Sequence, residues 1–102
     1  ILMSHQDVVP IDQPTLNDWE AHPFEGKITN DYVLGRGTLD DKGSIIGLLE
    51  AVEKLLEESF EPKRTIYLAF GHDEEISGKR GAKIYSQWFK DNNIKKTGII
   101  IL

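Results

Sequence analysis

The sequence contains no cysteine among its 102 residues. This absence excludes a disulfide-stapled scaffold, a cysteine-based zinc finger and a thiol nucleophile, and it is compatible with both cytosolic and secreted proteins. An excess of positive charge is also missing, because 12 Lys and Arg stand against 17 Asp and Glu, for a formal net charge of −5. The acidic balance argues against a nucleic-acid-binding protein, which needs a basic surface.

Long apolar runs are absent as well. No stretch approaches the roughly 20 apolar residues of a transmembrane helix, and no basic segment with an apolar core marks a signal peptide. Hydrophobic residues make up 39% of the chain and charged residues 28%, which is typical of a single globular domain. Because the chain begins and ends in short apolar runs, residues 1–3 and 99–102, we expect it to be part of a longer protein.

Two segments show the apolar periodicity of amphipathic helices. In residues 42–59 apolar side chains recur three and four positions apart, and Pro62 follows where helices usually stop. Residues 78–91 show a second apolar stripe. The expected buried faces comprise Ile45, Leu48, Leu49, Val52, Leu55 and Leu56 in the first helix, and Ile84, Tyr85, Trp88 and Phe89 in the second.

The remaining pattern predicts strands at residues 1–4, 65–70 and 99–102, a brief strand at 32–34, and a long surface loop over 10–31. The order strand, loop, helix, strand, helix, strand predicts an α/β fold: a mostly parallel sheet with helices packed on it. Right-handed crossovers are expected to put both helices on one face of the sheet.

Acidic residues and a histidine follow the predicted strands where these end. His5 and Asp7 follow the first strand, residues 73–75 form an acidic triplet after the second long strand, and Asp40 and Asp41 precede the first helix. Because ligands bind outside the carboxyl ends of parallel strands, the first two clusters are expected on one rim. The third reaches that rim only if its loop folds back. Crowded carboxylates repel one another, and together with imidazole they favour zinc or a similar first-row metal.

Each cluster also has a simpler interpretation. His5 and Asp7 point to the same side of an extended chain, as in zinc sites where a carboxylate fixes the imidazole tautomer, but also as in a surface ion pair. Asp40 and Asp41 can be a helix N-cap and its neighbour. The triplet 73–75 can be a solvated charge run, although it directly follows a buried strand. The joint position of all three clusters favours the metal site.

Other catalytic motifs are set aside. His22 lies in the predicted loop and is given no role, and His72 is at most a supporting or substrate-facing residue. Residues 35–40 lack the third glycine of a dinucleotide fingerprint, and residues 42–44 reverse the order of a phosphate-binding loop. No serine stands in a Gly-x-Ser-x-Gly context. A glycosidase-type pair of carboxylates would give no function to the His-x-Asp element at residues 5–7.

Three segments together resemble, in order and spacing, the N-terminal signatures of the M20 metallopeptidases, the group of aminoacylases, carboxypeptidases and succinyl-diaminopimelate desuccinylases. They are residues 4–10 (Ser-His-Gln-Asp-Val-Val-Pro), 35–43 (Gly-Arg-Gly-Thr-Leu-Asp-Asp-Lys-Gly) and 71–78 (Gly-His-Asp-Glu-Glu-Ile-Ser-Gly). The residues of the second and third segments are most similar to those of the carboxypeptidase S and N-acyl-amino-acid hydrolase branch. The resemblance implies that residues 1–102 are part of a zinc-peptidase-like three-layer catalytic domain, with the lid-like dimerisation domain outside this chain.

The resemblance also implies a role for each matching residue. His5 would bind the first metal ion, Asp40 would bridge two divalent ions, and Glu75 would bind the second. Asp7 would hold the His5 imidazole in position, and Glu74 would be the general base. The ions implied are Zn²⁺ first, with Co²⁺ or Mn²⁺ as alternatives.

Asp41 is left out of the implied ligand set. Two further ligands of the family, an acidic residue expected immediately after Leu102 and a distant histidine, are not in this sequence. The implied activity is hydrolysis of an amide bond next to a free carboxylate, in a small peptide or an N-acyl amino acid, by a protein compatible with a homodimer. We expect residues 1–102 alone to be inactive. The alternatives are a non-catalytic binding or structural domain that retains the fold, and an ordinary α/β domain with an acidic rim.

Overall fold

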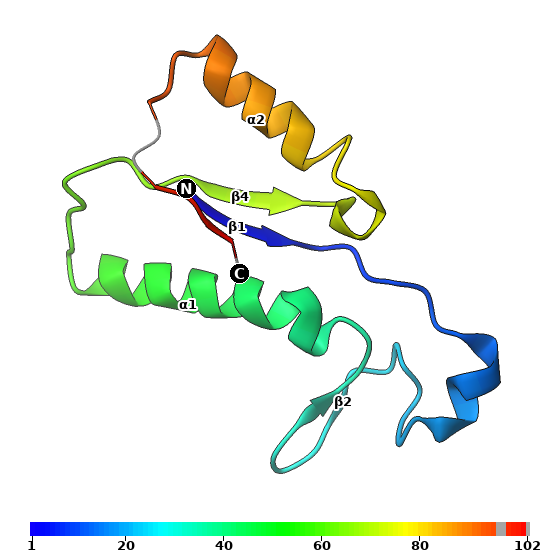
Figure 1. The fold of residues 1–102 in the computed structure, drawn as a ribbon. Helices are drawn as coiled ribbons and strands as arrows, with labels where there is room; N and C mark the ends of the chain where they lie inside the picture. Colours follow the sequence, from blue (N-terminus) through cyan, green and yellow to red (C-terminus); the bar gives the residue numbers. More distant parts are fainter. Residues whose placement is uncertain (96–97, 102) are drawn as a thin grey trace.

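The computed structural model describes residues 1–95 and 98–101. The predicted order of strands and helices is confirmed, with one short strand, β2, and three short helical turns added to it (Figure 1). The elements are β1 (Leu2–His5), η1 (Gln13–Asp18), β2 (Lys27–Ile28), β3 (Val33–Leu34), η2 (Thr38–Gly43), α1 (Ser44–Glu57), β4 (Leu68–Gly71), η3 (Glu74–Ile76), α2 (Ala82–Asp91) and β5 (Ile100–Ile101).

Strand β1 is the centre of a three-stranded sheet with the order β4-β1-β5. Both neighbours run parallel to β1, with His5 beside Gly71 in β4 and Leu2 beside Ile100 in β5. This arrangement confirms the α/β fold with a parallel sheet. The register also brings the carboxyl ends of β1 and β4 level with each other, so the residues after His5 and after Gly71 start from the same rim.

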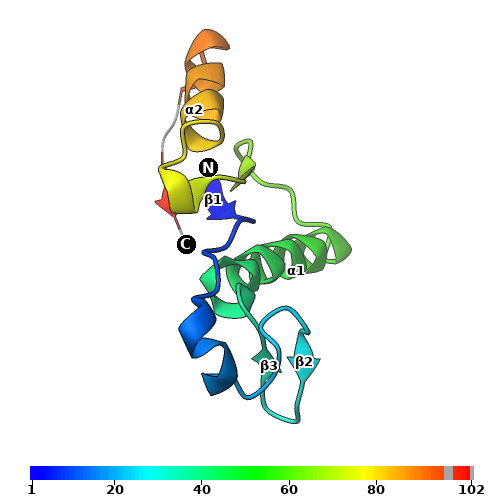
Figure 2. The same ribbon diagram turned by 90° about the vertical axis from the view of Figure 1, so that its right-hand side faces the viewer.

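The two helices lie on opposite faces of the sheet, α1 on one side and α2 on the other (Figures 1 and 2). The prediction that both helices share one face is therefore wrong. The chain moves from β1 outward to β4, and then returns past β1 to β5 on the far side. Because the direction of travel reverses, crossovers of the same hand cover opposite faces. The reversal makes the carboxyl end of β1 a topological switch point, where open α/β sheets bind ligands.

Several boundaries differ from the predicted ones. The helix predicted over 42–59 is α1, which starts two residues later and is preceded by the irregular turn η2. The second helix starts at Ala82 rather than at Gly78, because Gly78 adopts a left-handed conformation (φ +63°) and turns the chain before α2. Of the predicted third strand, Leu102 lies outside the described residues.

The predicted loop over 10–31 contains local structure that the sequence pattern did not reveal. Strand β2 pairs antiparallel with β3 in a small hairpin. The hairpin is closed by Thr29, whose backbone N–H and hydroxyl both donate to the Tyr32 carbonyl. The carbonyl of the buried Pro23 accepts the Arg36 N–H at 2.7 Å, so this segment is tied to the chain just before η2.

The apolar core is small. Ala69 of β4 and Phe89 of α2 are buried, and Tyr67 meets the Phe89 ring edge-on at 5.0 Å between centroids. The predicted face of α1 is only partly covered, because the sheet beneath it is three strands wide: half-buried residues are Ile45, Leu48 and Val52, and exposed ones are Leu49, Leu55 and Leu56. Among the described residues, no helix combines the length and apolar character needed to cross a bilayer.

Candidate metal centre

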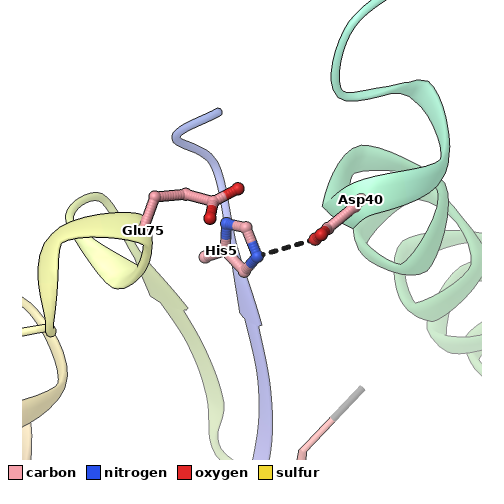
Figure 3. A group of neighbouring side chains, drawn as sticks. All are labelled: His5, Asp40 and Glu75. Carbon is pink, nitrogen blue, oxygen red and sulfur yellow. Dashed lines mark hydrogen bonds and ion pairs between the residues drawn. The ribbon is translucent and has the colours of Figure 1, made fainter. Parts of the chain in front are cut away.

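Three segments meet at the carboxyl end of β1. His5 is the last residue of β1, Asp40 comes from the turn η2, and Glu75 comes from η3. One ligand atom from each of these side chains lies within 4.8 Å of the other two. Figure 3 shows the three side chains converging from separate parts of the chain. The loop before α1 therefore folds back to the rim, as the metal-site hypothesis required.

The His5 imidazole is buried and has contacts at both ring nitrogens. Nδ1 lies 3.0 Å from the Asp7 carbonyl oxygen, and Nε2 lies 3.0 Å from Asp40 Oδ1 and 3.8 Å from Glu74 Oε2. Because a carbonyl only accepts, Nδ1 must carry the hydrogen, which leaves the Nε2 lone pair of a neutral ring facing carboxylates. A contact between Nε2 and these carboxylates is stable only when a positive charge lies at Nε2, either a proton or a metal cation.

The electrostatics of His5 follow this geometry. Burial alone would lower the pKa of His5, but the bond to the Asp7 carbonyl, the bond to Asp40 and the charges of Asp41 and Glu74 outweigh it and raise that pKa. Protonation of the metal-free ring is therefore favoured.

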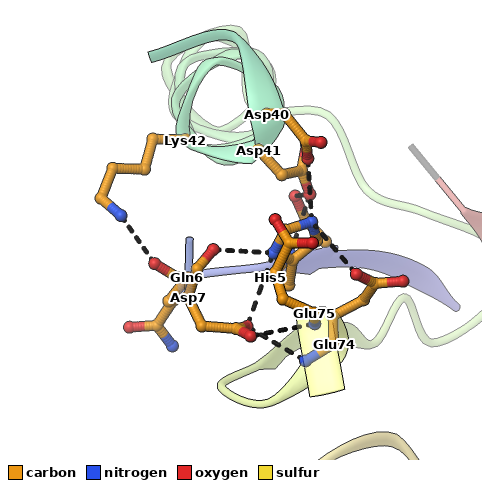
Figure 4. A network of polar contacts seen from close by, with 9 residues as sticks. His5, Gln6, Asp7, Asp40, Asp41, Lys42, Glu74 and Glu75 are labelled. Carbon is orange, nitrogen blue, oxygen red and sulfur yellow. Dashed lines mark hydrogen bonds and ion pairs between the residues drawn. The ribbon is translucent and has the colours of Figure 1, made fainter. Parts of the chain in front are cut away.

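Asp7 connects the end of β1 to η3. Its Oδ1 accepts the Glu74 N–H at 3.1 Å and its Oδ2 accepts the Glu75 N–H at 3.0 Å (Figure 4). Burial would raise the pKa of Asp7, but these two backbone bonds and the neighbouring His5 lower it overall. The carboxylate lies 3.5 Å from His5 Nδ1, farther than the carbonyl of the same residue. Asp7 thus contacts the imidazole chiefly through its backbone and holds η3 through its side chain.

Glu74 faces open space. Its side chain is 61% exposed, and it lines a cavity of about 360 Å³ together with His5, Asp40 and Asp73. The cavity lies between β1, β5 and the start of α2, at the switch point of the sheet. A carboxylate in this position can reach a small molecule in the cavity without being buried itself.

Asp41 takes a place that the sequence pattern did not indicate. It is only 3% exposed, and its Oδ2 accepts the Ser4 hydroxyl and the His5 N–H, the latter at 2.8 Å. Burial would raise the pKa of Asp41, but the hydroxyls of Ser4 and Ser44 and the His5 N–H lower it overall. The N-cap interpretation is wrong, because α1 has no side-chain capping bond. An acidic residue before an apolar helix is by default a cap, so no sequence signal separated the two roles.

Asp73 is also buried, at 4% exposure, but belongs to the turn before α2. Its Oδ2 accepts the Arg80 N–H at 2.6 Å, and Oδ1 has no hydrogen-bond partner among the described residues. Of the acidic triplet, only Glu74 and Glu75 therefore face the His5 group. His22 and His72 are exposed and lie outside that group.

The donor set fits a metal ion. One imidazole nitrogen and two carboxylate oxygens are ligands that zinc and related first-row metals accept, and a metal ion can replace the proton at His5 Nε2. All three donor atoms come from side chains of this chain.

The chain is similar to known proteins over nearly its whole length. The family described as Peptidase family M20/M25/M40 matches residues 1–101. A "Probable carboxypeptidase S-like 2" of Dictyostelium discoideum is 49% identical over 94 residues, 92% of this chain and 18% of the relative. The "N-fatty-acyl-amino acid synthase/hydrolase PM20D1" of Xenopus tropicalis is 42% identical over 107 residues, 100% of this chain and 20% of the relative. "Carboxypeptidase S" of Saccharomyces cerevisiae is 48% identical over 84 residues, 80% of this chain and 15% of the relative.

The chain thus spans a fifth or less of the length of these relatives. The family match nevertheless includes all three segments that meet at the carboxyl end of β1. On this match, and on the parallel sheet that carries those segments, the chain belongs to the M20/M25/M40 peptidase family.

Proposed function

We propose that the whole protein hydrolyses an amide bond next to a free carboxylate, in a small peptide or an N-acyl amino acid, with the help of divalent metal ions. The observation that carries this proposal is the position of His5 Nε2, which lies 3.0 Å from Asp40 Oδ1 and 3.8 Å from Glu74 Oε2. The relatives named carboxypeptidase S and N-fatty-acyl-amino acid synthase/hydrolase support the substrate class, since both kinds of substrate carry a free carboxylate beside an amide.

We assign His5, Asp40 and Glu75 as metal ligands, with Asp40 shared between two ions and Zn²⁺ as the preferred metal over Co²⁺ or Mn²⁺. The compact group of donor atoms supports this assignment. When bound, such ions polarise the scissile carbonyl and lower the pKa of a water molecule. The remaining ligands come from parts of the whole protein outside this chain.

Glu74 is the general base in this proposal. Its exposed carboxylate on the cavity wall, 3.8 Å from His5 Nε2, supports the role, because a base must reach both water and substrate. It takes the proton from the attacking water and delivers it to the leaving amine. Asp7 holds the backbone N–H groups of Glu74 and Glu75, and so keeps the base and the neighbouring ligand close to His5.

Residues 1–102 are then part of the catalytic domain, and the lid-like dimerisation domain lies elsewhere in the whole protein. The share of each relative that the chain covers supports this division. Because ligands and substrate contacts are missing from it, the 102-residue chain alone is inactive.

The test is metal-dependent hydrolysis by the whole protein. The purified protein is dialysed against a chelator and assayed on dipeptides and N-acyl amino acids, before and after addition of Zn²⁺, Co²⁺ or Mn²⁺. We expect activity to vanish on chelation and to return with metal, and substrates with a methylated carboxylate to be cleaved poorly. Activity that survives chelation contradicts the metal assignment. A metal-loaded protein that cleaves none of these substrates points to a non-catalytic binding domain.

A further inference from the structure

Asp41 is a buried carboxylate to which the proposed mechanism gives no task. It lies next to the ligand Asp40, yet it is not part of the group that could hold a metal ion. At 3% exposure, its charge has little contact with water. Burying an ionised carboxylate is costly unless hydrogen bonds replace the lost water, so its partners show what it does.

The partners of Asp41 lie on two other elements. Its Oδ2 accepts bonds from the Ser4 hydroxyl and the His5 N–H, which are both on β1, 36 or 37 residues away. At the start of α1, the Ser44 N–H donates to the backbone carbonyl of Asp41. Asp41 therefore connects η2 to β1 through its side chain, beside His5 and Asp40 (Figure 4), and to α1 through its backbone carbonyl.

The bond to the His5 N–H has a direct geometric consequence. It fixes the backbone of His5 against the residue that follows Asp40. The bond thus joins the residues that carry or adjoin the two ligand atoms His5 Nε2 and Asp40 Oδ1, which lie 3.0 Å apart. Chain continuity does not control this separation, because 35 residues separate the two side chains.

We propose that Asp41 is a positioning residue, which sets the separation of the His5 and Asp40 ligand atoms and thereby the affinity of the site for its metal. This inference rests on the proposed metal centre. Groups that orient metal ligands typically contribute 10–100-fold to metal affinity or activity. Lys42 adds a second link of the same kind, since its Nζ donates to the Gln6 carbonyl at 2.6 Å.

The test measures zinc affinity in the whole protein, by titrating the metal-free protein with Zn²⁺ in competition with a chromophoric chelator. We expect Asp41→Ala to weaken zinc binding about 10–100-fold. Asp41→Asn retains an oxygen that can accept both bonds from β1, so it should restore most of the affinity. Ser4→Ala removes one donor and should weaken binding about two- to tenfold, the equivalent of one hydrogen bond.

A merely structural role would show a different pattern. Phe89→Leu is the matched control, because it perturbs a buried side chain of α2 away from the candidate ligands. It should lower the thermal stability of the metal-free protein and leave zinc affinity unchanged. Zinc affinity of folded Asp41→Ala equal to that of wild type overturns the inference, and so does an equal loss of affinity in Phe89→Leu. If Asp41→Ala does not fold, unchanged affinity in Ser4→Ala overturns it. Wild-type protein that binds no zinc refutes the proposed metal centre itself.

Discussion

The carboxylate of Asp7 accepts the backbone N–H of Glu75 across 68 residues of sequence, with 3.0 Å between Oδ2 and the nitrogen. The other oxygen accepts the Glu74 N–H. A single side chain after β1 therefore holds the backbone of η3. Hydrogen bonds to an ionised acceptor are stronger than those between neutral groups, which suits a residue whose pKa is lowered by these contacts.

Asp7→Ala should reduce kcat/KM and zinc affinity about 10–100-fold, because both η3 bonds are lost and Glu74 and Glu75 are released. Asp7→Asn should fall between wild type and Asp7→Ala, since its amide NH₂ cannot accept one of the two bonds. Asp12→Ala, which removes the same group from a residue without a side-chain capping bond, is the control and should behave as wild type. Steady-state kinetics and zinc titration of the whole protein measure both quantities. Wild-type kinetics for Asp7→Ala would contradict the role.

The proposed metal ligands lead to a separate prediction, about the number of metal ions bound. His5→Ala and Asp40→Ala should each lower the bound metal per molecule of whole protein, as measured by elemental analysis after dialysis, because each removes one donor from the group around Nε2. His22→Ala deletes the same imidazole from an exposed position outside the group and should leave the metal content unchanged. An unchanged number of bound metal ions in His5→Ala would contradict its assignment as a ligand.

Much of this site could be predicted from residue order alone. Strand ends in a parallel sheet share a rim, so the approach of His5 and Asp7 to Glu74 and Glu75 follows from the alternation of strands and helices. The side of the sheet on which each helix lies could not be predicted in the same way. It depends on whether β5 pairs with β1 or with β4, and strand pairing is a tertiary choice that apolar strands of similar composition do not encode locally.

The roles of Asp41 and Asp73 were hidden for a related reason. In sequence, both are acidic residues next to other acidic residues. Their difference from Asp40 and Glu74 is burial, which long-range contacts decide: Asp41 bonds to β1, and Asp73 bonds to the backbone before α2. Strand β3 falls within the brief strand predicted at 32–34, but its hairpin partner β2 was missed because two residues are too few to show any periodicity.

Glu74→Gln tests the general base by an isosteric change. The amide keeps the shape and the backbone bond to Asp7 but cannot take a proton, so turnover should fall about 10²–10⁴-fold. Bound metal should stay at the wild-type level, because Glu74 is outside the ligand group. Glu53→Gln, the same change on the exposed surface of α1, is the control and should leave kcat unaltered. Near-normal turnover in Glu74→Gln would remove this residue from the role of base.

Gly81→Ala should destabilise the protein through a clash between the new Cβ and the Asp73 carboxylate. A Cβ at Gly81 would lie 2.5 Å from Asp73 Oδ1, and this carboxylate has little room to move because its other oxygen accepts the Arg80 N–H. Overpacking of this kind costs about 1–3 kcal/mol. Gly47→Ala is the matched control: a Cβ there meets nothing within 4 Å, and alanine at this position inside α1 should stabilise the helix by about 0.5–1 kcal/mol.

The measurement is the thermal unfolding midpoint of the whole protein, which Gly81→Ala should lower and Gly47→Ala should raise. The source of the Gly81 effect is tested by combining it with Asp73→Ala. Because the clash needs both groups, the double variant should be less destabilised than the sum of the two single variants. Strictly additive losses would show that the Cβ introduced by Gly81→Ala strains the turn before α2 through some contact other than the Asp73 carboxylate.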